Sequence, residues 1–313
     1  MEPIPFRIEA VKQELHDCFT LTLTPPPVAI DDQRNNDRKN DDIKNNNKEN
    51  DNRGNDNREN NRAGTFNFAP GQFNMLYAFG HGEVPISISG DPEHPQHLVH
   101  TIRNVGSVTA ALQRLKPGDT VGVRGPFGTS WPITAGPITA EPKAAHKNQH
   151  ILLVAGGLGL APLRPALNVL LANADQYRSV SLLYGTRTPE TILFADQLAQ
   201  WSETIDIRLT VDAASSNWRG HVGMITDLIY ERKILPANTT VLLCGPEIMM
   251  RFCTQALIEK GLSASQLYLS MERNMQCAIG LCGRCQYGPH FLCKDGPVFA
   301  FNQLQHWFQV REL

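Results

Sequence analysis

Four of the seven cysteines in this 313-residue chain stand close together near its C-terminal end. They follow the spacing C-x4-C-x2-C-x7-C, at Cys277, Cys282, Cys285 and Cys293. Cysteine thiolates gathered in one loop bind iron–sulfur clusters or zinc, because both need several soft ligands at short range. The spacing must therefore decide between a site that carries electrons and a metal that only stabilises a loop.

The first three cysteines reproduce the spacing of plant-type [2Fe–2S] ferredoxins. Such a loop wraps around inorganic sulfide and offers it amide hydrogens, and the small residues Ala278, Gly280 and Gly283 permit that close approach. Structural zinc sites usually combine two separate C-x2-4-C pairs, whereas here the pairs overlap and the last cysteine stands alone. The spacing favours a [2Fe–2S] cluster, with a four-thiolate zinc site and free thiols as alternatives.

A glycine-rich turn, "VAGGLGLAP" at 154–162, follows an apolar strand pattern and opens a helical one. Gly157 and Gly159 let the backbone turn tightly and approach a ligand, and the helix start would then face a pyrophosphate. Pro162 replaces the third glycine of the usual dinucleotide fingerprint, so a turn without a ligand remains an alternative. A position at the carboxyl end of a strand in an α/β sheet favours the ligand.

The stretch "VLLCGPEIMM" at 241–250 has the same strand-turn-helix pattern. It places Cys244 at a strand tip, with Gly245 and Pro246 opening the next helix. A lone cysteine is more often a buried filler than a functional group. Cys18 and Cys253 lie outside any metal-binding spacing, and we expect both to be structural.

Short strand patterns separated by Gly, Pro and Asp turns dominate the first 130 residues. Six such patterns and a single helical run predict a small antiparallel β-barrel; the strands are expected at 5–15, 19–25, 71–79, 84–90, 97–105 and 120–128, and the helix at 107–115.

Strand and helix patterns then alternate, which predicts an α/β doubly wound parallel sheet. Strands are expected at 150–157, 179–186, 205–211 and 239–245, and helices at 161–174, 193–203, 222–232 and 246–260. The expected organisation is a β-barrel domain at 1–132, an α/β domain at 150–270 and a small cysteine lobe at 271–313.

Two segments interrupt this organisation. Residues 31–62 contain 12 Asn and 17 charged residues among 32, with Ile43 the only aliphatic side chain. Such a segment cannot bury enough apolar area to offset the cost of ordering its backbone, so we expect a disordered insertion in a surface loop. Residues 134–150 are rich in Pro, Gly and Ala and suit a linker.

The overall composition excludes several classes of protein. The 29 basic and 31 acidic residues nearly cancel, which gives no electrostatic footprint for nucleic acid or an anionic membrane. No run of about 18 apolar residues occurs, and the first residues lack a signal-peptide pattern. We therefore expect a cytoplasmic protein without membrane insertion, in which cysteines serve as thiols or metal ligands before disulfides.

Several motifs occur in the order expected of one known family. They are "GEVPISISGDP", "IRNVGSVTAALQRLKPGDTVGVRGPFG", "VAGGLGLAPLRP", "LYGTRTPETILF", "CGPEIMM" and "CxxxxCGRCxxGPxxxCKDGPVF". Together they resemble the ferredoxin–NADP reductase superfamily, and within it the gamma subunits of cytoplasmic nickel–iron hydrogenases and sulfhydrogenases. The electron-transfer subunit of dihydroorotate dehydrogenase and the beta subunit of anaerobic sulfite reductase are near relatives. The resemblance covers the chain except 31–62 and much of 134–149.

The resemblance implies an FAD site on the barrel. The isoalloxazine would lie against Pro85, Ile86 and Ser87, with Ser87 near the flavin N5. The FAD pyrophosphate would lie at the start of the helix, at Gly106, Ser107, Val108 and Thr109. Many relatives have an arginine at the position of Val84, and Arg103 is the candidate to replace it. Without the resemblance, these stretches are an ordinary strand and an ordinary capped helix.

The resemblance also implies a site for a nicotinamide dinucleotide. Gly157, Gly159 and Pro162 would hold its pyrophosphate, and Gly185, Thr186 and Arg187 would lie on its adenosine side. Cys244, Gly245 and Pro246 would border the nicotinamide. Ser87 and Cys244 are the expected positioning residues for hydride transfer, and the four cysteines of the C-terminal loop are the expected cluster ligands. The sequence leaves NADH and NADPH equally open.

The implied function is an electron-transfer subunit with FAD, a [2Fe–2S] cluster and NAD(P). It would exchange hydride between NAD(P)H and FAD and pass single electrons to or from a redox partner in a hetero-oligomer. A nickel–iron hydrogenase or sulfhydrogenase is the first expectation for that partner, before dihydroorotate dehydrogenase or anaerobic sulfite reductase. A stand-alone ferredoxin reductase and a non-enzymatic, zinc-stapled assembly subunit are further alternatives.

Overall fold

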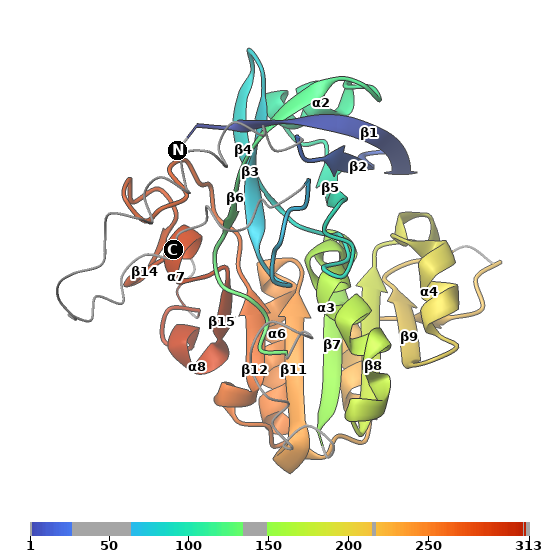
Figure 1. The fold of residues 1–313 in the computed structure, drawn as a ribbon. Helices are drawn as coiled ribbons and strands as arrows, with labels where there is room; N and C mark the ends of the chain where they lie inside the picture. The colour runs from blue at the N-terminus through green and yellow to red at the C-terminus, as the bar shows by residue number, and fades with distance from the viewer. Residues whose placement is uncertain (1, 27–63, 134–148, 215–216, 309, 311–313) are drawn as a thin grey trace, which may run out of the picture.

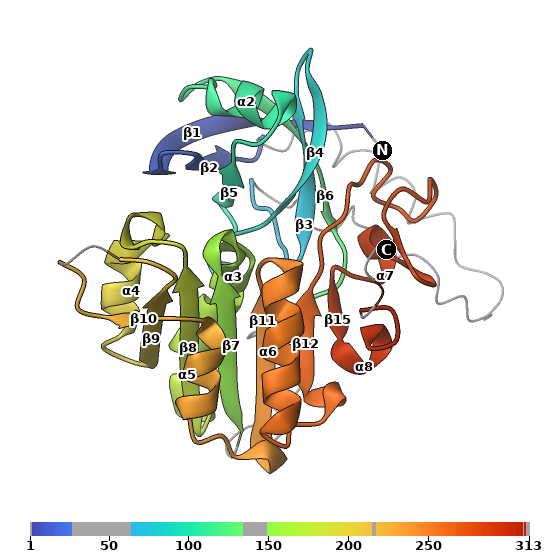
Figure 2. The same ribbon diagram turned by 180° about the vertical axis from the view of Figure 1, so that it is seen from behind.

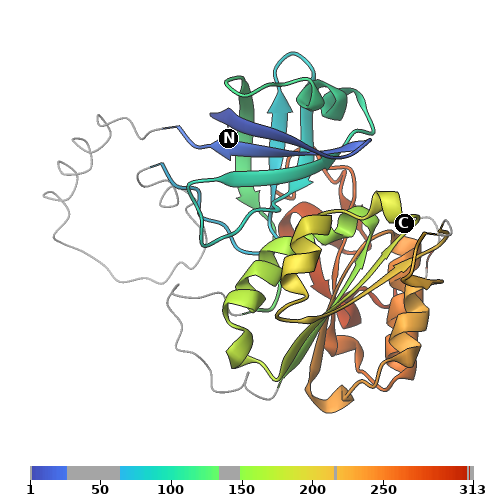
Figure 3. The same ribbon diagram turned by 90° about the vertical axis from the view of Figure 1, so that its right-hand side faces the viewer.

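The structure, a computed structural model, describes residues 2–26, 64–133, 149–214, 217–308 and 310. An antiparallel sheet formed by the first strands lies above an α/β layer, with the C-terminal region beside both (Figures 1 and 3). The expected insertion at 31–62 and most of the expected linker at 134–150 lie outside the described residues. In the part that is described, no helix is long and apolar enough to cross a membrane.

The N-terminal sheet has six antiparallel strands in the order β4-β3-β6-β1-β2-β5. Its two edge strands meet at a bridge between Ile88 and His100, which brings the sheet round on itself as the predicted barrel requires. The strands are β1 (Ile4–Leu15), β2 (Cys18–Thr24), β3 (Phe73–Ala78), β4 (Gly82–Ser87), β5 (Leu98–Arg103) and β6 (Thr120–Phe127), and one helix, α2 (Ser107–Gln113), follows β5.

Alternating side chains explain why this sheet curls around a core. Along β1, Phe6 and Ile8 are buried while Arg7 and Glu9 are exposed. This period of two is typical of a strand with one face in the core and the other in solvent. Phe6 packs edge-to-face on Phe66, with ring centroids 5.6 Å apart. The barrel therefore has a core of its own, separate from the α/β layer.

The second sheet has seven strands in the order β10-β9-β8-β7-β11-β12-β15, all parallel except β15. The first strand of this sheet along the sequence, β7, lies between β8 and β11, so the sheet is doubly wound as predicted. The strands are β7 (His150–Gly156), β8 (Ser179–Thr186), β9 (Asp206–Val211), β10 (His221–Val222), β11 (Thr239–Cys244), β12 (Leu267–Ser270) and β15 (Val298–Ala300).

Helices cover both faces of this sheet. One face carries α3 (Leu160–Ala172) and α4 (Ala195–Trp201), and the other carries α5 (Ile225–Glu231) and α6 (Glu247–Glu259), which lie side by side in Figure 2. The strands between them are buried on both sides and read as continuous apolar runs, which is typical of parallel sheets.

The C-terminal region packs onto the same sheet. It contains β13 (Gln286–Tyr287), β14 (His290–Phe291), α7 (Leu292–Asp295) and α8 (Phe301–Leu304), and its strand β15 pairs antiparallel with β12 through Leu269 and Phe299. The side chains of Cys285, Tyr287 and Cys293 belong to the core that also holds α5 and α6. The cysteine loop is therefore anchored on the α/β layer by its own buried residues.

Candidate functional site

The strand ends predicted to hold a dinucleotide lie along one edge of the parallel sheet. Strands β8, β7 and β11 are neighbours and end at Thr186, Gly156 and Cys244. This edge brings together the three predicted groups, which are Gly157, Gly159 and Pro162, then Gly185, Thr186 and Arg187, then Cys244, Gly245 and Pro246. Ligands of doubly wound sheets bind where strand order reverses at the carboxyl edge, and β7 is that point.

The two glycines of the turn serve different needs. Gly157 has φ +52° and nothing within 4 Å of the place where a Cβ would stand, so it is left-handed and open. At Gly159 a Cβ would lie 2.2 Å from the carbonyl oxygen of Cys244, so this glycine lets α3 pack against the end of β11. Gly157 therefore leaves space in which a ligand can approach the turn, and Gly159 allows α3 to pack closely against the end of β11.

A buried tyrosine holds the glycine turn in place. The hydroxyl of Tyr184, on β8, donates to the carbonyl oxygen of Gly157 at 3.1 Å and accepts from the amide of Leu193 at 3.1 Å. Burial raises the pKa of Tyr184, so the hydroxyl stays protonated as a donor. Pro162 is itself buried, and its carbonyl accepts from the indole of Trp131 at 3.1 Å.

We expect Tyr184→Phe to lower the free energy of unfolding by about 1–3 kcal/mol, because the buried amide of Leu193 loses its acceptor. Urea unfolding followed by circular dichroism measures this loss. Tyr230→Phe is the matched control, since the Tyr230 hydroxyl donates to Glu259 on an exposed surface and its loss leaves no buried group unpaired. Equal costs for the two variants would contradict the assigned role of Tyr184.

Cys244 lies at the predicted strand tip, but its side chain points inward. The residue is 1% exposed, and burial, with Glu272 adding to it, raises the pKa of its thiol. The thiol is therefore protonated and is no nucleophile. The other two cysteines outside the loop, Cys18 and Cys253, are buried as well.

Glu272 was not singled out by the sequence. Glu272 lies two residues after the end of β12, the strand next to β11, which ends at Cys244. Its negative charge acts electrostatically on the Cys244 thiol. The side chain of Glu272 is exposed to solvent. The sequence could not point to Glu272, because this residue belongs to no motif and follows a strand that was not predicted.

The predicted flavin segment is β4, an edge strand of the six-stranded sheet. Every residue of β4 is half-buried, including Pro85, Ile86 and Ser87. Behind it, buried His100 donates from Nδ1 to the carbonyl oxygen of Ser87 at 3.0 Å and accepts at Nε2 from Asn74 at 3.1 Å. Desolvation lowers the pKa of His100 to about 4 despite these partners, so a neutral imidazole fixes the end of β4.

The start of α2 lies beside the beginning of β4. A Cβ on Gly82 would stand 3.3 Å from the side chain of Val108. Gly106 and Ser107 are exposed, whereas the hydroxyl of Thr109 is used internally, accepting from the amides of Val105 and Gly106. An exposed helix start next to an edge strand fits a long dinucleotide such as FAD. Thr109 would support such a site indirectly, because its hydroxyl caps the start of the helix.

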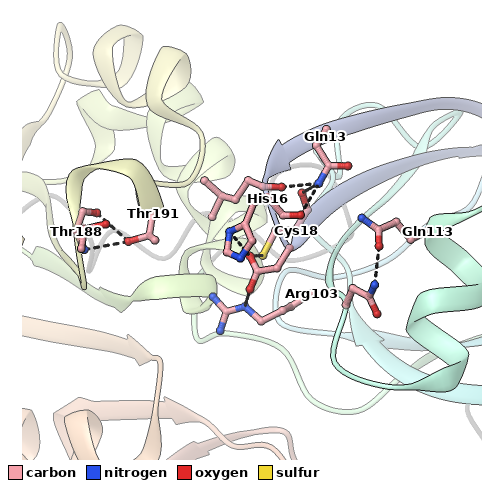
Figure 4. Close-up of polar contacts among 10 residues, drawn as sticks. Gln13, His16, Cys18, Arg103, Gln113, Thr188 and Thr191 are labelled. Atoms are coloured by element: carbon pink, nitrogen blue, oxygen red, sulfur yellow. Dashed lines mark hydrogen bonds and ion pairs between the residues drawn. The ribbon is translucent and has the colours of Figure 1, made fainter.

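Arg103, the candidate to replace the missing arginine at Val84, already has a partner. Its Nε lies 3.3 Å from the Asp17 carboxylate, and its side chain is 40% exposed. Figure 4 shows its guanidinium extending away from Gln113 of α2, toward the side on which Thr188 and Thr191 lie. This orientation lends no support to a contact with a phosphate at the start of α2.

An arginine joins the dinucleotide edge to the flavin edge. Arg164, on the first turns of α3, donates from Nη1 to the carbonyl oxygen of Ser89 at 3.2 Å, two residues beyond Ser87. Its guanidinium also lies 4.6 Å from the ring centroid of Phe194. This contact therefore joins α3, the helix that follows the glycine turn, to the segment just after β4, across the boundary between the two layers.

The four cysteines of the loop lie as two pairs. The amides of Cys282 and Leu281 donate to the sulfur of Cys277, and the amide of Cys293 donates to the sulfur of Cys285. The amide of Gly280 donates to Cys293 at 3.1 Å and ties one pair to the other.

This donor set fits a two-iron cluster. Desolvation opposes ionisation of Cys277, but amide hydrogen bonds from Ile279, Cys282 and Leu281 outweigh it and lower the pKa to about 6. Desolvation, and next the thiol of Cys285, raise the pKa of Cys293 to about 12. Two thiol pairs with amides directed at sulfur match two irons with two cysteines each. Within the described ranges, no three His, Cys, Asp or Glu side chains converge on a single ion.

Two family models match the chain in the places that the geometry indicates. "Oxidoreductase NAD-binding domain" matches residues 153–255, which contain the glycine turn and the end of β11. "Iron-sulfur cluster binding domain of dihydroorotate dehydrogenase B" matches residues 272–305, which contain the four cysteines.

Curated relatives match most of the chain. The chain is 36% identical over 245 residues to sulfhydrogenase 1 subunit gamma of Pyrococcus furiosus, covering 75% of this chain and 80% of the relative. It is 33% identical over 237 residues to a probable dihydroorotate dehydrogenase B (NAD(+)) electron transfer subunit of the same organism, covering 76% and 81%.

A solved structure shares the whole architecture. The structure of an NADH-dependent reduced ferredoxin-NADP oxidoreductase superposes with a TM-score of 0.66 at 23% identity, covering 98% of this chain and 94% of that one. The arrangement of the barrel and the α/β layer is therefore a known fold. The chain belongs to the ferredoxin–NADP reductase superfamily, as an FAD- and NAD-binding electron-transfer subunit with an iron–sulfur domain.

Proposed function

We propose that this chain exchanges hydride between NAD(P)H and FAD and passes single electrons through a [2Fe–2S] cluster to or from a partner of the hydrogenase type. Nicotinamide supplies two electrons as hydride, a flavin holds both, and the cluster carries one at a time. The observation that supports this most directly is the Arg164–Ser89 contact, because it joins the helix after the glycine turn to the segment after β4 in one chain.

The residues divide this task among three regions, for which we propose the boundaries 1–132, 150–270 and 271–313. Ser87 and its neighbours Pro85 and Ile86 would hold the flavin ring, and the start of α2 its pyrophosphate. Gly157 would admit the NAD(P) pyrophosphate. Cys244, with its buried neutral thiol, would act by shaping the strand end and not by accepting a proton. Cys277, Cys282, Cys285 and Cys293 would hold the cluster.

The tip of the cysteine loop suits contact with a redox partner in the cytoplasm. Ile279 and Leu281 are 56% and 80% exposed beside the ligands, and exposed apolar side chains mark contact surfaces. A partner that covers them would also exclude water from the path of the electron. The similar identities to a sulfhydrogenase subunit and to a dihydroorotate dehydrogenase subunit leave dihydroorotate dehydrogenase as the second candidate.

The test of the redox assignment is an electron paramagnetic resonance spectrum of the anaerobically purified chain before and after addition of NADH or NADPH. We expect a [2Fe–2S] signal to develop on reduction by one of them. Iron, sulfide and flavin analysis accompanies the spectrum. Zinc in place of iron, together with a colourless protein, would establish the zinc-stapled assembly subunit instead.

The partner is identified by the substrate that reduces NAD(P)⁺ in the native complex. Reduction by H₂ supports the hydrogenase assignment, and reduction by dihydroorotate supports the second candidate. Sulfite-dependent oxidation of NAD(P)H would point to a sulfite reductase. Full activity of the isolated chain with a soluble ferredoxin alone would make it a stand-alone reductase.

A further inference from the structure

An ion pair joins the barrel to the cysteine loop. Arg124, on β6, donates from Nε and Nη2 to the two carboxylate oxygens of Glu83, on β4, at 2.7 and 2.6 Å. The pair spans β3, since Arg124 lies opposite Met75 and Glu83 lies opposite Tyr77. The side chains are only 11% and 19% exposed, so solvent and salt screen the pair less than a surface pair.

The same guanidinium reaches the chain next to the first cysteine. Nη2 donates to the carbonyl oxygen of Gln276 at 3.3 Å, and Nη1 approaches the carbonyl oxygen of Cys277 at 3.4 Å. The cysteine loop lies beside β6 and β3 in both Figures 1 and 2. A fixed positive charge therefore lies at the backbone of a proposed cluster ligand, with its balancing carboxylate on the far side, in the barrel.

The pair also lines a cleft between the barrel and the loop. This cleft has a volume of about 600 Å³ and is bordered by Met75, Tyr77, Glu83, Arg124, Met275 and Gln276. Arg124 is thus hydrogen-bonded both to the barrel and to the backbone of the cysteine loop. The geometry thus singles out one charge pair that links barrel and loop.

We propose that the Arg124–Glu83 pair sets the reduction potential of the cluster held by the cysteine loop, with Arg124 as a positioning residue. This inference rests on the proposed function. Reduction adds one negative charge to the cluster, so a nearby positive charge favours the reduced form and a nearby negative charge opposes it. Arg124 raises the potential and Glu83 moderates that effect.

The two halves of the pair give opposite expectations. Arg124→Gln removes the positive charge and leaves Glu83 uncompensated, so the midpoint potential of the cluster falls. Glu83→Gln leaves Arg124 uncompensated, so the potential rises. The double variant lies between them. A pair that only holds the loop in place predicts shifts of the same sign, or none, because either substitution breaks the same contact.

The measurement is a potentiometric reduction of the full chain followed by electron paramagnetic resonance. Arg232→Gln is the matched control: Arg232 is 19% exposed and pairs with Asp206 at 2.6 Å at the start of β9, away from the cysteine loop, and we expect no shift. Arg124→Lys, which keeps the charge, should remain nearer to the wild-type potential than Arg124→Gln.

Opposite shifts support the inference, and shifts of one sign or unshifted potentials overturn it. If Arg124→Gln does not retain its cluster, Glu83→Gln decides alone: a higher midpoint potential supports the inference, and an unchanged or lower one overturns it. A wild-type chain that binds no [2Fe–2S] cluster would overturn the proposed function and this inference with it. A wild-type cluster with unshifted variants would overturn this inference only.

Discussion

Replacement of Cys277 by serine is expected to abolish the [2Fe–2S] signal while leaving electron transfer from NAD(P)H to ferricyanide through the flavin intact. Serine offers a harder oxygen ligand with a shorter reach, and iron–sulfur clusters are held by thiolates. The sulfur of Cys277 also accepts the amides of Leu281 and Cys282, so its loss releases the turn that carries one thiol pair. The flavin and dinucleotide edges lie on other elements and keep their contacts.

Two measurements on the purified variant check this expectation: the iron and sulfide content, and the ferricyanide reductase rate. Cys253→Ala is the control, because Cys253 is buried in α6 and lies outside the loop. It removes one sulfur and leaves the cluster, at a stability cost of about 1 kcal/mol. An unchanged signal in Cys277→Ser, or a signal lost in Cys253→Ala, would contradict the ligand assignment.

Most of the regular elements could be predicted because their signals are local. The period-two alternation at the start of β1 and the apolar runs of β7 and β11 follow directly from which faces are buried. The predicted helix at 107–115 ends two residues early, at Gln113, and the others also lose residues at their ends, where helices commonly fray.

Three strands of the second sheet were not predicted. β10 has only two residues and includes Val222, where a helix was expected; β12 has four, and β15 has three and lies inside the cysteine region. Nothing in so short a run distinguishes a strand from a loop. β15 exists because the chain returns from the cysteine loop along the free edge of β12, so its cause is tertiary and not local.

The candidate site shows the same division between local and distant causes. The spacing of the cysteines and the position of Cys244 at a strand tip could be predicted, since each belongs to one short stretch. The inward orientation of the Cys244 thiol could not, because it depends on the packing of β11 against its neighbours. Arg164 and Ser89 are 75 residues apart and meet only because α3 lies under the end of β4.

The glycine turn gives the second large effect, and it separates two roles within three residues. We expect Gly157→Ala to fold but to bind NAD(P)H at least about tenfold more weakly, a loss of about 1.4 kcal/mol of binding free energy. The new methyl group meets no protein atom within 4 Å, so it projects into the space where the pyrophosphate would approach. The left-handed φ of +52° adds a folding cost of about 1 kcal/mol.

Gly159→Ala should instead strongly destabilise the folded chain. Its methyl group would lie 2.2 Å from the oxygen and 2.5 Å from the carbonyl carbon of Cys244, and neither backbone atom can move without separating α3 from β11. A cost of about 3 kcal/mol or more is expected, measured by urea unfolding.

Gly64→Ala is the control for backbone strain, because Gly64 has φ +71° and equally open surroundings in a segment with no proposed contact to the dinucleotide. It should lose stability as Gly157→Ala does and keep the wild-type Kd for NAD(P)H in a fluorescence titration. If Gly157→Ala binds NAD(P)H as the wild type does, the pyrophosphate does not lie at this turn. Gly157 and Gly64 differ only in the proposed contact with the dinucleotide, so equal binding by both variants would place the dinucleotide elsewhere along the edge of the sheet.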